Sequence, residues 1–140
     1  MKKTMWTHQE SVETTAAPER IWELFSDVNR WKQWNSGIQH IELHGPFVVG
    51  TTFSMRTMEN EQFLSTLVAV ENNKSFTDET VIDGTRILVH HDISPLPSGN
   101  TKVTYSTEIT GPNAAQFGAT VTGDFADVLK ALKTLAEQRK

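Results

Sequence analysis

The chain has 140 residues, no cysteine and a formal net charge of −4. This length fits a single domain over residues 1–140, and the missing cysteines exclude disulfides and thiolate chemistry. Neither charge sign is gathered into a block, so nucleic acid is not an expected partner, and no stretch has the character of a membrane span or secretory signal. The sequence therefore predicts a soluble, cytoplasmic protein.

The first predicted element is a strand over residues 5–15. Trp6, His8, Glu10 and Val12 fall in one phase of this segment, and the opposite phase is wholly polar from Thr7 to Glu13. Such alternation is typical of a strand with one buried face. We expect the phase of His8 and Glu10 to face the interior.

Two short helices are predicted next, and they hold three of the four tryptophans. Pro18 suits the first position of a helix, and Asp27 is the expected N-cap of a second helix that ends near Trp34. Aromatic rings of this size bury a large area. We expect Trp22 to lie in the core, and Trp31 and Trp34 to lie at the mouth of a pocket.

The following seventy residues alternate between strand and turn patterns. Asp83-Gly84 is a strong signal for a two-residue hairpin turn, and Asn72-Asn73 is a plausible turn. The sequence predicts mostly antiparallel hairpins, with strands at about 38–43, 51–58, 62–70, 75–82, 85–94 and 101–110.

A long helix is predicted from Ala114 to about Gln138. Its apolar residues recur at spacings of three and four, which places them on one stripe facing the sheet. Gly118 and Gly123 weaken the first half, where each costs up to about 1 kcal/mol relative to alanine.

This order of elements resembles the START/Bet v 1-like superfamily, especially the bacterial polyketide cyclase/dehydrase and lipid-transport group. The resemblance covers nearly the whole chain and is carried by the segments 14–22, 27–35, 45–51, 74–77, 91–93, 99–104 and 109–112. It implies an α+β helix-grip fold, in which a curved antiparallel sheet of about seven strands wraps around a long C-terminal helix and leaves an internal cavity. Relatives include carriers, cyclases and co-chaperones, so the resemblance leaves the activity open.

The alternation of side chains along each strand indicates which polar residues would face such a cavity. We choose His91 over His90, because Ile87, Val89 and Ile93 share its phase. Alternation on the next strand brings Tyr105 close to His91. His91 and Glu10 are candidate acid–base catalysts, since burial shifts the pKa of such groups, while His8 and Tyr105 are candidate ligand contacts. An inward His or Tyr is more often a hydrogen-bonded core residue than a catalyst, and the alternative for Glu10 is a solvated rim residue.

The expected apolar wall of the cavity consists of large side chains from the helices and strands. Its members are Trp31, Trp34, Phe53, Met55, Phe76, Phe117, Val121 and Phe125.

The leading functional hypothesis is binding of a small hydrophobic or aromatic molecule, lipid- or polyketide-like, inside the cavity. A cofactor-independent polyketide cyclase or dehydratase is the alternative, and a co-chaperone-like interaction module is a third. We expect no metal, because His40 and His44 lie on a strand without an accompanying carboxylate pattern. No glycine-rich nucleotide fingerprint occurs, so no cofactor is expected. The oligomeric state and the identity of the ligand stay open.

Overall fold

The computed structural model describes residues 5–58, 60–123 and 125–138. Within these ranges the chain forms one sheet and three α-helices, together with a short 3₁₀ helix, η1. In chain order they are β1 (Met5–Thr14), α1 (Pro18–Ser26), η1 (Val28–Gln33), β2 (Ile38–Leu43), β3 (Thr52–Thr57), β4 (Gln62–Glu71), β5 (Ser75–Ile82), β6 (Thr85–Pro95), β7 (Thr101–Thr110), α2 (Ala114–Thr122) and α3 (Phe125–Glu137).

The seven strands form one antiparallel sheet in the order β1-β7-β6-β5-β4-β3-β2. The predicted hairpin at Asp83-Gly84 is confirmed: both residues have positive φ angles, of 51° and 80°, as the tight turn between β5 and β6 requires. Asn73, with φ of 63°, turns the chain between β4 and β5. The predicted strands agree with the observed ones to within one or two residues.

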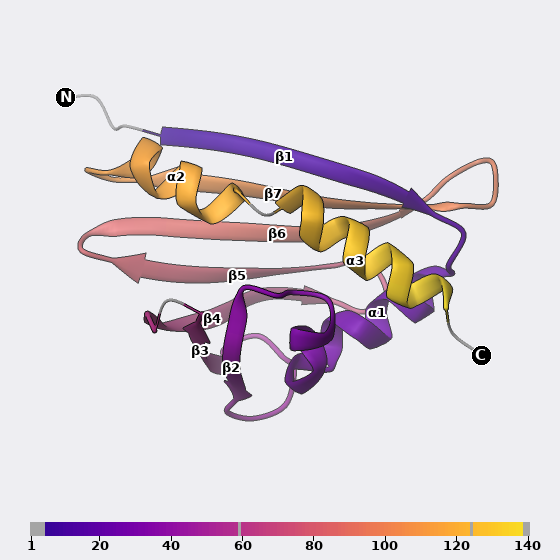
Figure 1. The fold of residues 1–140 in the computed structure, drawn as a ribbon, viewed down its shortest axis with the longest axis horizontal. Helices are drawn as coiled ribbons and strands as arrows, with labels where there is room; N and C mark the ends of the chain where they lie inside the picture. The colour runs from indigo at the N-terminus through magenta and orange to yellow at the C-terminus, as the bar shows by residue number, and fades with distance from the viewer. Residues whose placement is uncertain (1–4, 59, 124, 139–140) are drawn as a thin grey trace.

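The sheet is strongly curved. Its register shifts between Leu67 and Ala69 where β4 pairs with β5, and again between Ile38 and His40 at the edge strand β2. Such irregularities bend a strand and increase its twist. In Figure 1, β2, β3 and β4 turn away from β5, and α2 and α3 run across the same face of the sheet. We call the face covered by these helices the inner face.

The C-terminal helix differs from the prediction, because it consists of two helices rather than one. α2 ends at Thr122 and is followed by Gly123, and α3 begins at Phe125. Gly118, in α2, is buried against the Trp6 indole of β1, and a Cβ built at Gly118 would overlap that ring. The glycine therefore lets α2 approach β1 closely, at the expense of helix stability.

The apolar core is divided into two clusters. The larger one lies under α1, η1 and α3, and includes Phe25, Leu129 and Leu132, all nearly inaccessible to solvent. The smaller one lies under α2 around Ile87, Ile109 and Ala114. Val89 is half-buried and packs against both clusters.

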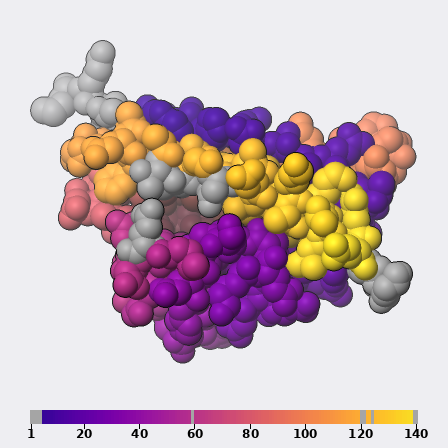
Figure 2. Space-filling model, viewed as in Figure 1, coloured from indigo at the N-terminus to yellow at the C-terminus, as the bar shows by residue number. Residues whose placement is uncertain are grey.

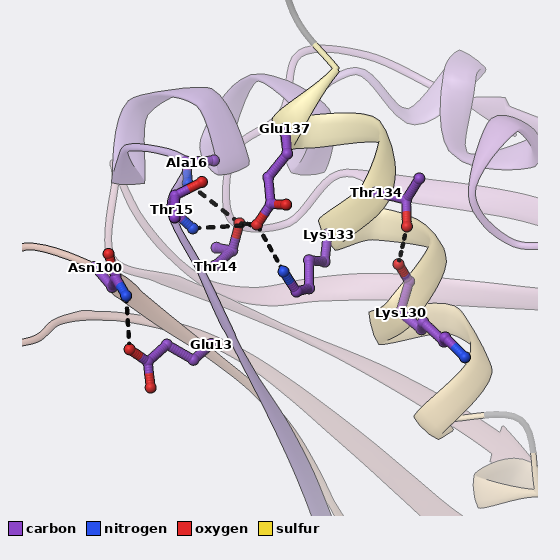
Figure 3. Close-up of polar contacts among 9 residues, drawn as sticks. All are labelled: Glu13, Thr14, Thr15, Ala16, Asn100, Lys130, Lys133, Thr134 and Glu137. Carbon is purple, nitrogen blue, oxygen red and sulfur yellow. Dashed lines mark hydrogen bonds and ion pairs between the residues drawn. The ribbon is translucent and has the colours of Figure 1, made fainter.

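A hydrogen-bond cluster at Glu137 fastens the end of α3 to the turn after β1 (Figure 3). Its carboxylate accepts hydrogen bonds from the Thr14 hydroxyl at 2.6 Å, the Thr15 backbone N–H at 3.1 Å and the Lys133 ammonium at 2.8 Å. The Lys133 bond, followed by those from Thr14 and Thr15, lowers the Glu137 pKa to about 2. This contact holds α3 across the inner face.

We expect E137Q to lower the free energy of unfolding by about 1 kcal/mol at neutral pH, because charge-assisted hydrogen bonds are lost at a solvent-exposed site. Since the folded-state pKa is lowered, the wild-type advantage is complete above the ordinary glutamate pKa and disappears as the pH falls towards about 2. Urea denaturation at several pH values measures it. E13Q is the matched control, because Glu13 accepts a single hydrogen bond, from Asn100 (Figure 3), and an equal loss in both variants would contradict this role for Glu137.

Candidate functional site

In β1 and β6, the residues that were expected to face the interior do face the helices. In β1, Trp6, His8, Glu10 and Val12 are half-buried, while the residues between them are exposed. In β6 the His91 ring is buried. His90 lies on the opposite face, where its ring contacts the Thr77 hydroxyl at 2.9 Å and the Glu108 carboxylate at 3.1 Å.

Sheet register brings the predicted polar residues into one row. Glu10 pairs with Tyr105, and Tyr105 pairs with His91, across three adjacent strands. His8 lies two residues from Glu10 and contacts its carboxylate at 2.8 Å. All four predicted polar residues therefore converge on the inner face.

His8 and Glu10 form the solvated end of this row. Their side chains are 35% and 40% exposed, which fits the rim position that the sequence left open for Glu10. The His8 ring stacks on Trp6 at a centroid distance of 5.8 Å and lies 6.4 Å from the Phe125 ring.

His91 forms the buried end of the row, inside a box of aromatic rings. Phe76 stacks on the imidazole at 3.9 Å, and Tyr105 and Phe25 meet it edge-on at 4.6 Å and 5.7 Å. Nδ1 lies 3.2 Å from the Phe76 carbonyl oxygen, which can only accept, so Nδ1 carries the proton and Nε2 is an acceptor. Burial lowers the His91 pKa to about 3, against a weaker opposing effect of the Phe76 carbonyl.

Asp78 is a site residue that the sequence reasoning missed. Its carboxyl lies on the inner face of β5 with Oδ2 3.9 Å from His91 Nε2, and its burial raises its pKa to about 7. Both members of this pair are therefore largely uncharged at about pH 6, one unit below the Asp78 pKa. The signal was present in the alternation of β5, because Asp78 shares its phase with the buried Phe76.

The tryptophans occupy other places than expected. Trp31 and Trp34 are 6% and 3% exposed and belong to the larger core cluster, so the expected position at a pocket mouth is wrong. The Trp31 N–H donates to the Phe25 carbonyl at 2.8 Å. The short η1 helix places the Trp31 and Trp34 rings beneath α1. Trp22, expected in the core, packs against the larger core cluster but is only half-buried, and it meets Phe47 and Phe76 edge-on.

The other predicted wall residues divide into a packed group and an open group. Phe53, Phe76 and Phe125 are buried, whereas Met55 and Phe117 are half-buried. The Val121 side chain lies outside the described residues. Whether a ligand contacts any of these side chains stays a prediction.

The inner face has an open end below α2, which we call the inner hollow. Apolar side chains that point to the inner face are only half-buried there, and they are Trp6, Met55, Phe63, Ile82, Val89 and Phe117. Figure 2 shows a depression at this end, between α2 (orange) and the magenta strands. Val89, which borders it, is the cross-strand partner of Asp78, so the Asp78–His91 pair lies at the inner end of the hollow.

Two surface depressions are lined by described residues. One, of about 510 Å³, opens where β4 and β5 diverge beyond the Ser65–Thr80 pair, and its lining includes the inner-face residues Phe63, Thr80 and Ile82. The other, of about 420 Å³, is lined by Gln33 and the outer side of α3. The lining of the first also includes exposed residues of the outer face, Leu64 and Val81.

Within the described ranges, no three His, Asp or Glu side chains are grouped closely enough to hold a metal ion. No helix among the described residues has the length and apolarity needed to cross a membrane.

Comparisons with known proteins agree with this architecture. Residues 5–137 match the family described as polyketide cyclase / dehydrase and lipid transport. No curated protein sequence matches the chain significantly.

Solved structures share the fold at low sequence identity. Truncated norcoclaurine synthase from Thalictrum flavum has a TM-score of 0.79 at 18% identity, with 100% of this chain and 98% of that chain covered. Ara h 8.0201 has a TM-score of 0.78 at 14% identity, covering 97% and 100%. A START superfamily protein from Mycobacterium smegmatis has a TM-score of 0.75 at 16% identity, covering 94% and 97%. The family match and the helix-grip fold together show that this chain belongs to the polyketide cyclase / dehydrase and lipid transport family, within the START/Bet v 1-like superfamily.

Proposed function

We propose that the protein binds a small hydrophobic or aromatic molecule, lipid- or polyketide-like, in the inner hollow. The observation that carries the proposal is the set of half-buried apolar side chains on the inner face below α2. The larger core cluster fills one end of the inner face and buries the side chains there. At the other end the apolar side chains are incompletely buried, which leaves space for an apolar ligand. Binding there would remove this apolar surface from water.

The packing on either side supports the same location. Val89 contacts both core clusters, and Trp6, Ile82 and Phe117 pack against the smaller one, so the hollow adjoins the smaller cluster. α2, which covers the hollow, contains Gly118 and is followed by Gly123, so its helical structure is weaker than that of α3. A ligand could therefore enter by a small displacement of α2 without disturbing the packed end.

Filling the hollow with a side chain tests the proposal. V89W is expected to abolish the thermal shift and the binding isotherm of apolar aromatic probes such as 2-methylnaphthalene. Because the hollow accommodates the indole, the variant is also expected to lose less than the 1–3 kcal/mol, roughly, that an overpacked core costs.

V49W is the matched control, since Val49 is 59% exposed in the loop between β2 and β3 and lines neither depression. Probe binding by V49W should equal that of the wild type. Unchanged binding by V89W, or no binding of any apolar probe by the wild type, would contradict the proposal.

A second candidate is cofactor-independent cyclisation or dehydration in the same space. The observation that favours it is the Asp78 carboxyl, which lies 3.9 Å from the His91 imidazole and whose pKa burial raises to about 7, close to the value that proton transfer near pH 7 needs. With a reactive polyketide-like substrate, H91Q and E10Q are each expected to lower turnover at least about tenfold, the lower part of the range for acid–base catalysts. Unchanged turnover in both variants would dismiss these roles.

A further inference from the structure

The gap between Asp78 and His91 has the chemistry of a hydrogen-bonding site. His91 Nδ1 is engaged by the Phe76 carbonyl, so Nε2 presents an unshared acceptor towards Asp78 Oδ2. The separation of 3.9 Å is too long for a direct hydrogen bond. Burial keeps the carboxyl protonated over much of the range below neutral pH, so it can act as a donor. A donor and an acceptor thus face one another across a gap.

The size of the gap fits one bridging oxygen atom. An oxygen about 2.8 Å from each of the two facing atoms would subtend an angle of about 90°, which is within hydrogen-bonding geometry. A hydroxyl group satisfies both sides, because it accepts from Asp78 and donates to His91 Nε2. A carbonyl oxygen can only accept, so it would leave Nε2 unsatisfied.

The surroundings disfavour an anionic group at this place. None of the lysine or arginine side chains that the structure describes is buried. Arg20 and Lys133 are half-buried, and each is paired with a glutamate, Glu23 and Glu137 respectively. A ligand carboxylate beside Asp78 would therefore be desolvated without a counter-charge, which is costly.

We propose that the Asp78–His91 pair anchors the hydroxyl group of an uncharged, apolar alcohol or phenol that fills the inner hollow. This inference rests on the proposed binding function and names its ligand class. Val89 links the two parts of the site, because it borders the hollow and is the cross-strand partner of Asp78.

Three aromatic probes of similar size separate the chemistries: 2-naphthol, 2-methylnaphthalene and 2-naphthoate. Isothermal titration calorimetry on the full chain at about pH 6, where Asp78 is mostly protonated, should give at least about tenfold tighter binding of 2-naphthol than of the other two. Equal affinities for 2-naphthol and 2-methylnaphthalene would overturn the inference while leaving the proposed binding function intact. Failure of all three to bind would count against both.

Variants assign the preference to the pair. H91F retains a ring in the aromatic box but removes the acceptor, and D78L removes the donor; each should reduce the ratio of 2-naphthol to 2-methylnaphthalene affinity to about one, a loss of about tenfold. H90F is the matched control, because His90 lies on the opposite face, and its ratio should stay at the wild-type value. A preserved ratio in H91F and D78L would overturn the assignment.

A measurement on the wild type covers the case in which these variants do not fold. The ¹⁵N resonance of His91 Nε2 should shift when 2-naphthol binds and stay in place when 2-methylnaphthalene binds. If instead a tightly held water bridges Asp78 and His91, 2-naphthol will leave that resonance unchanged, and the inference fails.

Discussion

The D78N variant is expected to become progressively more stable than the wild type as the pH rises from about 4 to about 7. Burial raises the Asp78 pKa from its ordinary 3.8 to about 7, so in this range the folded protein holds a proton that the unfolded chain has released. The contribution of Asp78 to wild-type stability is fully present below the pKa that Asp78 has in the unfolded chain. It is lost as the pH rises through the pKa that Asp78 has in the folded protein. The amide that D78N introduces does not titrate and avoids the loss, which amounts to roughly 4 kcal/mol over about three pH units.

Urea denaturation across this range measures the difference between the two free energies of unfolding. If the amide changes the free energy of unfolding by a constant amount, the difference between D78N and the wild type shifts equally at every pH and its slope stays the same. E42Q is a matched control, because Glu42 is exposed on β2, and its difference curve should be far flatter. A difference curve for D78N that falls with rising pH would show a charged Asp78–His91 ion pair instead and would contradict the neutral one.

The H91Q variant is expected to show the opposite trend, gaining stability relative to the wild type as the pH falls from about 6.5 to about 3. Burial lowers the His91 pKa to about 3, so in this range the unfolded chain takes up a proton that the folded protein excludes. Wild-type stability from His91 is complete above the unfolded pKa and is lost on acidification towards the folded one. The change is again roughly 4 kcal/mol, because each pH unit is worth about 1.4 kcal/mol.

The control for this variant is H90Q, whose parent imidazole lies on the outer face between Thr77 and Glu108. Only H91Q should gain stability in acid. Parallel curves for H91Q and the wild type would show that the buried imidazole is charged in the fold or reaches solvent.

The two effects oppose each other in the wild type. Between about pH 4 and pH 6.5 the folded state holds one extra proton on Asp78 and lacks one on His91, so the slopes cancel. The pH dependence of wild-type stability alone would therefore not show the two shifted pKa values. The pH dependence of D78N and of H91Q shows each of them separately. A neutral donor and a neutral acceptor in one apolar place are also what the proposed hydroxyl anchor needs.

The strands could be predicted from the sequence because their signals are local. Alternation separates the two faces of β1, β6 and β7, and Asp83-Gly84 fixes the turn between β5 and β6. Since the phases were right, antiparallel pairing brought His8, Glu10, Tyr105 and His91 together as expected.

The misplaced elements depend on tertiary contacts. The end of α2 at Thr122 accompanies the close approach of Gly118 to Trp6, which no spacing of apolar residues indicates. The burial of Trp31 and Trp34 depends on how η1 docks beneath α1. Asp78 was missed because an aspartate is ordinarily a surface residue, although the phase of Phe76 placed it inside.

The proposed function depends above all on where an apolar ligand lies. Methyl NMR on the wild type, with 2-methylnaphthalene added stepwise, tests this directly. Saturable shifts are predicted for the methyl groups of Met55, Ile82 and Val89, which border the inner hollow, while those of the exposed Leu64 and Val81 stay in place. Shifts confined to Leu64 and Val81 would place the ligand on the outer surface at the depression between β4 and β5 and would contradict a binding site in the inner hollow.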